Sequence, residues 1–371
     1  MQTWKLKPTI YLGEDSLSSL TQLTNQRVFI ICDPFLLKAP VLSSIVGKME
    51  QNHNIVQLYA DVSPDPPIED IVKGIEAMRA YQPDSMIAIG GGSAIDLAKG
   101  VMYFNQQISK QKVSQFIAIP TTSGTGSEVT NISVITDKAN NIKYPLADDT
   151  LIPDVAILNV DLVMSAPNSV VSYSGLDVLT HALEALVATK SNSLTDALSE
   201  KAIELVFTHL ANSYHNKDRY SREKMHEASC LAGMAFNDAG LGINHAIAHQ
   251  LGGQFHIVHG LANAMLLPHV VGFNSRNETA KTKYAQIARK NGISNFQVKD
   301  EIAVNQLVTA IRDLAKNLDC KMSLTSNGIT REVAERAAET LVENAYSDIT
   351  TQTNPVAVTK NDLRNVYLQI I

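Results

Sequence analysis

The chain has 371 residues, of which 45% are apolar and 18% are charged, and its formal net charge is −6. It is long enough for one large core or two ordinary ones, and it contains no block of like charges of the kind that binds nucleic acid or an anionic membrane. We therefore expect chemistry on a small molecule, with no nucleic-acid or membrane partner. The three cysteines are odd in number and widely spaced, which favours free thiols in a reducing compartment. Because the first ten residues lack the apolar core of a signal peptide and no later run could span a bilayer, we expect a cytoplasmic protein.

Short β-type runs alternate with helical patterns through the first half of the chain. Strands that are continuously apolar and separated by helices predict a parallel sheet covered on both faces, with ligands at the carboxyl ends of the strands. We expect helices at 68–81 and 94–104, and a hairpin of strands 132–136 and 142–146. The strands of the sheet are expected at 27–32, 55–59, 85–89, 115–119 and 155–158. This half is predicted to be a Rossmann-like α/β domain.

An acidic residue, Asp33, follows the first of these strands directly. A carboxylate at a strand end can accept the hydroxyls of an adenosine ribose and would repel a 2′-phosphate, so Asp33 favours NAD over NADP. Asp33-Pro34 is also a common turn or helix-start pair, and the sequence leaves both roles open.

A glycine run follows the third strand and opens the next helix. Glycine lets backbone amides approach a pyrophosphate closely, and a helix N-terminus adds free N–H groups and a positive dipole end. The spacing is not that of the standard fingerprint G-x-G-x-x-G. Ser93 and Asp96 also have the spacing of a capping box, so a structural role is equally open. The predicted phosphate-binding residues are Gly90, Gly91, Gly92 and Ser93.

A third polar loop, residues 120–128, also follows a strand directly. Its hydroxyls and glycines can hydrogen-bond phosphates and the carboxamide of a nicotinamide, which predicts a cofactor role for this loop.

Beyond residue 158 the strand pattern fades, and helical patterns at 169–189, 194–215, 222–239 and 331–346 predict an all-helical second half. We place the boundary near residues 165–168, where Asn168 can cap the next helix. The predicted domains are 1–166, which binds the dinucleotide, and 167–371, which holds a metal and the catalytic residues. The reactive centre is expected in the cleft between them, as pockets at domain interfaces commonly are.

Two pairs of metal-ligand residues in the second half have helical spacing. Asp177 and His181 are four residues apart in an amphipathic helical pattern, so their side chains share one face. His245 and His249 repeat this spacing on a second helix. On spacing alone, the two members of each pair can reach one ion together.

A fifth candidate ligand, His259, follows Gly252-Gly253, where we expect the chain to bend and return. One carboxylate and several neutral imidazoles suit Fe(II) or Zn(II) better than a soft thiolate site or an all-oxygen calcium site. By spacing alone, His249 competes with the other histidines as a ligand.

These segments resemble the signatures of the iron-containing (group III) alcohol dehydrogenases. The resemblance rests on residues 175–184 (GLDVLTHALE), 245–252 (HAIAHQLG) and 259–269 (HGLANAMLLPH), and it extends through the whole chain. It is greatest to the branch of the family that serves bacterial propanediol utilisation. It implies a dehydroquinate synthase-like architecture, in which a Rossmann-like α/β domain with a parallel sheet precedes an all-α domain.

The resemblance also assigns residues. It implies that the metal ligands are Asp177, His181, His245 and His259, and that the ion is Fe²⁺, although the same donor set accepts Zn²⁺. It leaves His249 for proton transfer or substrate contact, and we place Asp96 with it as catalytic. The cofactor implied is NAD(H), contacted in addition by Thr121, Thr122, Ser127 and Lys143.

The expected activity is NADH-dependent reduction of a small aliphatic aldehyde, propionaldehyde to 1-propanol, and the reverse oxidation, with the metal as Lewis acid. The resemblance further implies a homodimer and a place in or beside a bacterial microcompartment, with its shell or lumen enzymes as partners. Glycerol, polyol or ethanol dehydrogenases of the same fold are alternatives. A dehydroquinate synthase-like lyase and a non-catalytic scaffold are alternatives of another class. The lyase would need Lys and Arg side chains around an anionic substrate, whereas the ligand-bearing segments are apolar.

Overall fold

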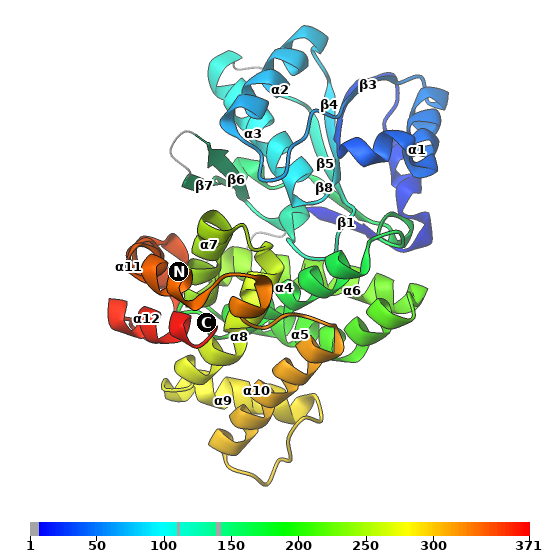
Figure 1. Cartoon of the computed structure of the whole chain (residues 1–371). Helices are drawn as coiled ribbons and strands as arrows, with labels where there is room; N and C mark the ends of the chain where they lie inside the picture. The colour runs from blue at the N-terminus through cyan, green and yellow to red at the C-terminus, as the bar shows by residue number, and fades with distance from the viewer. Residues whose placement is uncertain (1–6, 110–111, 139–141) are drawn as a thin grey trace. The chain divides into compact units, whose positions relative to one another are not determined.

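The computed structural model describes residues 7–109, 112–138 and 142–371. The chain divides into two compact units, Met1–Ala166 and Pro167–Ile371, which we call the sheet unit and the helical unit. Figure 1 shows the course of the chain through each unit, and each is described by itself.

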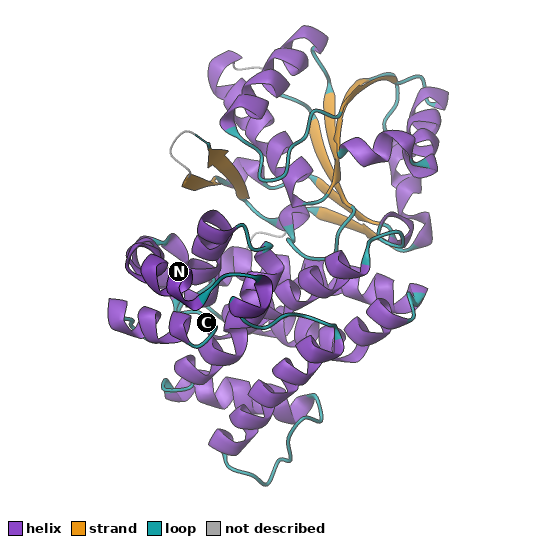
Figure 2. Ribbon diagram, viewed as in Figure 1, coloured by secondary structure: helices purple, strands orange, loops and turns teal. Residues whose placement is uncertain are grey.

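The sheet unit is built on a six-stranded sheet in which every pair of neighbouring strands is parallel, in the order β1-β8-β5-β4-β2-β3. Figure 2 shows these strands as one twisted layer. The predicted parallel sheet is confirmed. The strands are β1 (Thr9–Leu12), β2 (Arg27–Cys32), β3 (Ile55–Tyr59), β4 (Ser85–Gly90), β5 (Gln115–Pro120) and β8 (Val155–Leu158).

Both faces of the sheet are covered, which explains why its strands are apolar at successive positions. Phe29 and Ile31 of β2 belong to a core shared with α2 (Ile68–Tyr81) and α3 (Gly92–Ser109). Val28 and Ile30 belong to a second core that includes α1 (Pro40–Gln51) and the 3-10 helix η1 (Glu14–Gln22). Alternate residues of one strand therefore point into opposite cores, as the period of two in a strand requires.

A separate hairpin of β6 (Ile132–Asp137) and β7 (Ile142–Ala147) is antiparallel, as the sequence predicts. Strand β1 and helix α1 are not predicted by the sequence. Strand β1 is a four-residue edge strand with no fully buried position. Helix α1 contains two serines and a glycine, which are weak helix formers, so packing on the sheet has to stabilise it.

The helical unit consists of helices with short connections, and the predicted helical second half is confirmed. Helix α4 lies in its centre, packs against α5, α6 and α8, and is buried from Gly175 to its end. None of the helices within the described residues combines the length and apolar character of a membrane span. The α-helices are α4 (Asn168–Val187), α5 (Ser193–His215), α6 (Arg219–Ala239), α7 (Ile243–Phe255), α8 (His259–Asn274), α9 (Glu278–Lys290), α10 (Asp300–Asn317), α11 (Arg331–Ser347) and α12 (Lys360–Leu368).

Two local predictions in this unit are wrong. Asn168 does not cap α4, because it is the first helical residue and Pro167 holds the cap position without a side-chain hydrogen bond. The chain also does not bend at Gly252-Gly253, because α7 runs through both glycines and ends when His256 adopts the left-handed conformation at φ 55°. The helix keeps its hydrogen bonds across the glycines, including His256 N–H to the Gly252 carbonyl at 3.1 Å.

Candidate metal centre

Helix α4 presents Asp177 and His181 one turn apart, and both are buried. Burial of an acid and an imidazole on one helix face is costly unless they have partners, so this face has to meet other polar groups. Helices α7 and α8, which pack against each other, supply them (Figure 1).

His245 lies in the first turn of α7, and His259 is the first residue of α8. One ligand atom from each of Asp177, His181, His245 and His259 can be chosen such that all four lie within 4.8 Å of one another. The Asp177 Oδ1 atom is 3.8 Å from His245 Nε2 and 3.6 Å from His259 Nε2. The rings of His181 and His245 stack with centroids 4.6 Å apart. The structure thus brings the four predicted ligands together.

An asparagine, Asn263, holds these acceptor atoms in place. Its side-chain Nδ2 group lies 2.6 Å from Asp177 Oδ1, 3.0 Å from His245 Nε2 and 3.1 Å from His259 Nε2. The orientation of this amide is fixed by Asn244, whose Nδ2 donates to the Asn263 backbone carbonyl at 3.2 Å and to Asn263 Oδ1 at 2.9 Å. This Nδ2 group has two N–H bonds and faces three atoms of the acceptor type, so the Asp177 carboxylate and the two Nε2 atoms surround a single donor.

A buried carboxylate, Glu184, contacts the other side of one ligand ring. Its Oε2 atom is 2.6 Å from His245 Nδ1, and its Oε1 atom accepts the Asn244 N–H at 2.8 Å. When His245 Nε2 ligates an ion, Nδ1 carries the proton and donates it to Glu184, whose pKa burial raises to about 8. A carboxylate that fixes the tautomer of a ligating histidine in this way is a common feature of metal sites.

The electrostatics of the cluster suit a cation. Burial, with the neighbouring histidines, lowers the pKa of His245 well below its usual value, so this ring is neutral and can donate a lone pair. Burial raises the pKa of Asp177, although His181 and the hydrogen bond from Asn263 lower it. A divalent ion would favour the charged form of Asp177, and one carboxylate with three imidazoles fits Fe(II) or Zn(II). The residues present therefore fit the implied metal.

His249 is not part of this group of four. Its ring stacks on that of His259, with centroids 5.6 Å apart and planes 15° apart, and its Nδ1 atom is 2.9 Å from Asp348 Oδ2. The group of four thus includes His259, and His249 lies beside it. Phe236, on α6, stacks on His181 with centroids 4.5 Å apart and supports that ring from its other side.

Asp33, the glycine run and Thr121 lie at the carboxyl ends of β2, β4 and β5 in the parallel sheet. Strand β2 pairs with β3 on one side and with β4 on the other, so the order in which strands are added to the sheet reverses between β2 and β4. This is a topological switch point, where open α/β sheets bind their ligands. Asp33, after β2, accepts the Gly91 N–H at 2.8 Å through its Oδ2 atom, so the acid and the glycine run meet there.

Two of the glycines are required by packing. A Cβ atom at Gly90 would lie 2.6 Å from both Asp33 Oδ2 and Ala94 Cβ, and one at Gly92 would lie 2.8 Å from Thr125. Helix α3 begins at Gly92, so its N-terminal N–H groups lie at the switch point. Asp33 is also the cap residue of the 3-10 helix η2 (Pro34–Lys38), without a side-chain cap bond, so its helix-start role coexists with the bond to Gly91.

Thr121, beside the glycine run, has a hydroxyl that makes no hydrogen bond to the described residues. It follows β5, its N–H donates to the Gly90 carbonyl at 3.0 Å, and its buried Oγ1 atom has no hydrogen-bond partner among the described residues. A buried hydroxyl without a partner is unfavourable unless something binds it. This supports the fit of a polar ligand at the switch point. Thr122 is partly exposed and lies beside Gly91.

Other predicted residues have structural partners. The Ser127 hydroxyl donates to Asp96 Oδ1 at 2.6 Å, and the Val134 N–H donates to Asp96 Oδ2 at 3.1 Å. These bonds connect α3 to the loop of residues 120–128 and to β6. Asp96 therefore does not form the predicted capping box with Ser93, and the Ser93 hydroxyl instead accepts the Asp65 N–H at 3.2 Å. A direct catalytic role of Asp96 stays a prediction. The side chain of Lys143 lies outside the described residues, although its backbone pairs with Thr136 in the hairpin.

Comparison with known proteins agrees with this arrangement. The family model "Iron-containing alcohol dehydrogenase" matches residues 8–160, and "Fe-containing alcohol dehydrogenase family, C-terminal" matches residues 171–371. The chain belongs to the iron-containing alcohol dehydrogenases. It is therefore an oxidoreductase.

Several relatives of this alcohol dehydrogenase resemble it over their full length. It is 44% identical to the 1-propanol dehydrogenase PduQ of Citrobacter freundii over 96% of each chain. It is 38% identical to the NADPH-dependent butanol dehydrogenase of Clostridium saccharobutylicum, over 99% of this chain and 97% of the relative. The crystal structure of a 1,3-propanediol oxidoreductase superposes with a TM-score of 0.91 at 28% identity, over 98% of each chain.

The sequence analysis did not predict a site role for three polar residues of this alcohol dehydrogenase. Glu184 lies seven residues after Asp177 on α4, and Asn263 lies four residues after His259 on α8, so helical spacing could have indicated both. Asp348 follows α11 with no pattern that relates it to His249. Its contact depends on how the helices pack.

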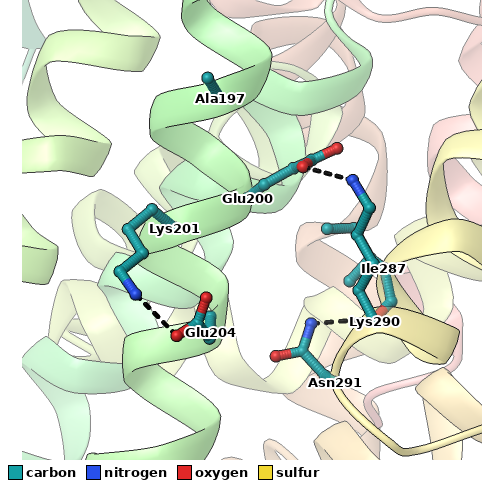
Figure 3. Close-up of a pocket in the computed structure, with 7 residues that line it drawn as sticks. All are labelled: Ala197, Glu200, Lys201, Glu204, Ile287, Lys290 and Asn291. Carbon is teal, nitrogen blue, oxygen red and sulfur yellow. Dashed lines mark hydrogen bonds and ion pairs between the residues drawn. The ribbon is translucent and has the colours of Figure 1, made fainter.

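A separate surface hollow lies between α5 and α9 of the alcohol dehydrogenase (Figure 3). Its charged side chains pair with one another, Glu200 with Lys290 at 2.6 Å and Lys201 with Glu204 at 2.7 Å. The remaining lining residues are Ala197, Ile287 and Asn291. It contains none of the predicted site residues.

Proposed function

We propose that this enzyme reversibly reduces a small aliphatic aldehyde, propionaldehyde to 1-propanol, with NADH as the hydride donor and a divalent metal held by Asp177, His181, His245 and His259. The observation that carries the proposal is the convergence of one ligand atom from each of these four residues within 4.8 Å. The names of the related 1-propanol and butanol dehydrogenases support a short aliphatic substrate.

The switch point of the sheet supports a dinucleotide. Asp33 uses Oδ2 for the Gly91 N–H, which leaves Oδ1 for the hydroxyls of an adenosine ribose. The same charge disfavours a 2′-phosphate, which supports NAD over NADP even though one relative is named as NADPH-dependent. The N-terminus of α3 and the hydroxyl of Thr121 supply donors for phosphate oxygens.

When bound, the dinucleotide supplies or accepts the hydride, and the metal polarises the oxygen of the aldehyde or alcohol as a Lewis acid. Asp177 and the three imidazoles supply the lone pairs, and Glu184 contacts the Nδ1 atom of His245 and so favours the tautomer in which Nε2 ligates. His249 lies beside His259 without belonging to the ligand group, which suits it to carry the proton that the substrate oxygen gains or loses.

The experiment that tests this proposal joins metal analysis of the purified enzyme with NADH oxidation in the presence of propionaldehyde. We expect about one Fe or Zn per chain and one NADH consumed per aldehyde, and we expect His259→Ala to lose most of its metal and at least about 100-fold in activity. His256→Asn is the matched control, because His256 lies outside the ligand group and asparagine tolerates its left-handed backbone. Full metal content and activity in His259→Ala would contradict the ligand assignment.

Cofactor preference is tested with Asp33→Asn, which keeps an acceptor for the Gly91 N–H while removing the charge. We expect the ratio of NAD to NADP activity to fall roughly tenfold, since one charge near a phosphate is worth about 1.4 kcal/mol. Asp33→Gly would be less clear, because it would also remove the contact that supports the glycine run. An unchanged ratio in Asp33→Asn would contradict the role of Asp33.

A further inference from the structure

The contact between His249 and Asp348 joins two segments that are 99 residues apart in the chain. His249 lies on α7, one turn after His245, and its side chain is 32% exposed. Asp348 lies between α11 and the 3-10 helix η7 (Ile349–Thr353), and its side chain is 13% exposed. A partly exposed histidine thus contacts a mostly buried acid.

Each oxygen of Asp348 has its own partner. Its Oδ1 atom accepts the Thr350 N–H at 2.9 Å and the Thr350 hydroxyl at 2.8 Å, which caps η7, and its Oδ2 atom lies 2.9 Å from His249 Nδ1. Burial would raise the pKa of Asp348, but the hydrogen bonds from His249 and Thr350 outweigh it and lower the pKa below its usual value. The carboxylate is therefore charged and accepts only, so Nδ1 of His249 carries the proton.

This arrangement fixes what the other ring nitrogen can do. With the proton on Nδ1, the lone pair of neutral His249 lies on Nε2. The stacking of the ring on His259, at 5.6 Å and 15°, holds it next to the ligand group. The Nδ1 atom of His249 therefore donates to Asp348, and the Nε2 atom can accept a proton.

We propose that Asp348 is the positioning residue that keeps His249 in the Nδ1–H tautomer, so that Nε2 accepts the hydroxyl proton when an alcohol is oxidised. In that step the O–H and C–H bonds of the alcohol break, the hydride with its electron pair goes to NAD⁺, the proton goes to His249 Nε2, and the C=O bond forms. Aldehyde reduction returns the same proton to oxygen. This inference rests on the proposed function.

The chain contains a matched control for the capping role. Asp148 caps the 3-10 helix η4 (Asp149–Leu151) in the same way, since its Oδ1 atom accepts the Thr150 N–H at 2.8 Å and the Thr150 hydroxyl at 2.6 Å. Capping needs only this one oxygen. The structural difference that matters is the second oxygen of Asp348, which contacts a histidine.

The experiment compares Asp348→Asn, Asp148→Asn, His249→Ala and the double variant Asp348→Asn/His249→Ala in steady-state 1-propanol oxidation. The asparagine can still cap Thr350, but its NH₂ group would donate to Nδ1 and favour the Nε2–H tautomer. We expect kcat to fall roughly 10- to 100-fold in Asp348→Asn with KM within about threefold, and no comparable loss in Asp148→Asn. The double variant is expected to be no slower than His249→Ala, because both changes remove one function.

A second readout does not depend on turnover. Metal content is expected to be unchanged in Asp348→Asn, and the ¹⁵N NMR spectrum of the zinc-loaded, histidine-labelled enzyme is expected to show one histidine whose tautomer changes from Nδ1–H to Nε2–H. If Asp348→Asn fails to fold, Asp348→Ser keeps a capping oxygen without the carboxylate and is expected to show the same loss of kcat.

The possible outcomes separate this inference from the proposed function. A normal kcat in Asp348→Asn beside a slow His249→Ala, or an unchanged tautomer, would overturn the role of Asp348 and leave the proposed function standing. Loss of metal in Asp348→Asn would also overturn it, because the residue would then act on the ligands. Full activity in His249→Ala would remove the proton role and with it this inference, while His259→Ala decides the proposed function independently.

Discussion

The sheet unit and the helical unit each bury a cluster of ionisable side chains, and the two clusters differ in their balance of donors and acceptors. In the sheet unit, the fully buried ammonium of Lys99 donates to the carbonyls of Thr130 and Ile132, each at 2.8 Å, and lies near the carboxylates of Asp96 and Glu128. In the helical unit, Asp177 and three imidazoles present acceptors to one another, with the amide of Asn263 donating to them.

The difference lies in where the positive charge comes from. The sheet cluster includes its own cation, so it can serve as a structural tie between α3, the third loop and β6. The four ligand-type residues of the helical cluster are one acid and three imidazoles, a set of acceptors that an added cation satisfies best. Buried polar groups of similar appearance are thus distinguished by whether the chain itself supplies the opposite charge. The following predictions test this distinction.

The largest effect is expected for Asp177→Asn, which removes the negative charge of the helical cluster while keeping its shape and an acceptor for Asn263. Metal should be lost, and activity should fall at least about 1,000-fold, because the Lewis acid contributes several kcal/mol. The metal-free variant should be no less stable to denaturant than the metal-free parent, since a costly buried charge is gone. Metal analysis and unfolding curves check both points, and a marked loss of stability without loss of metal would contradict a metal role.

The next effect is expected for Lys99→Met, which removes the internal cation of the sheet cluster. The buried carboxylates of Asp96 and Glu128 would lose their counter-charge, so the free energy of unfolding should fall by roughly 3–5 kcal/mol. Lys290→Met is the control, because its pair with Glu200 is exposed at the surface and is worth less than about 1 kcal/mol. Denaturant unfolding followed by circular dichroism measures both, and equal losses would show that Lys99 is not a structural cation.

A smaller effect is expected for Glu184→Gln. The glutamine can still accept the Asn244 N–H, but it cannot accept from His245 Nδ1 as a carboxylate does. The dissociation constant for metal should rise roughly 10- to 100-fold, the range found when the partner of a ligating histidine is lost. Competition with a chelator measures the constant. An unchanged constant would show that Glu184 serves only the backbone of α7.

The smallest effect for each pH unit is a pH dependence of stability in the sheet cluster. Burial raises the pKa of Glu128 to about 7, although Lys99 lowers it, so the folded protein holds a proton between about pH 4.5 and 7 that the unfolded chain has released. Stability should therefore fall as the pH rises through this window, by at most about 1.4 kcal/mol per pH unit for this group. Glu128→Gln should remove that part of the slope. Unfolding free energies of both proteins at pH 5, 6 and 7 provide the measurement, and parallel curves would contradict it.

Helical spacing and strand-end position predicted which residues are candidates for the site, and the family resemblance chose His259 over His249 among them. Asp177 and His181 share a face because helix geometry requires it, and Asp33 and Gly91 meet because the carboxyl ends of parallel strands lie at one edge. The errors had physical causes as well. The glycines of α7 looked like a bend, but the hydrogen bonds of the helix continue across them.

What the sequence determined by itself was local: which residues are apolar, which ligand types recur at one turn, and which polar loops follow strands. Only the tertiary structure decided that Asn263 contacts Asp177, His245 and His259, that Glu184 contacts His245, and that Asp348 contacts His249. The reason is that spacing along one helix fixes directions only within that helix. Which faces of two helices meet depends on the packing of all their side chains, and no single segment of the chain encodes that packing.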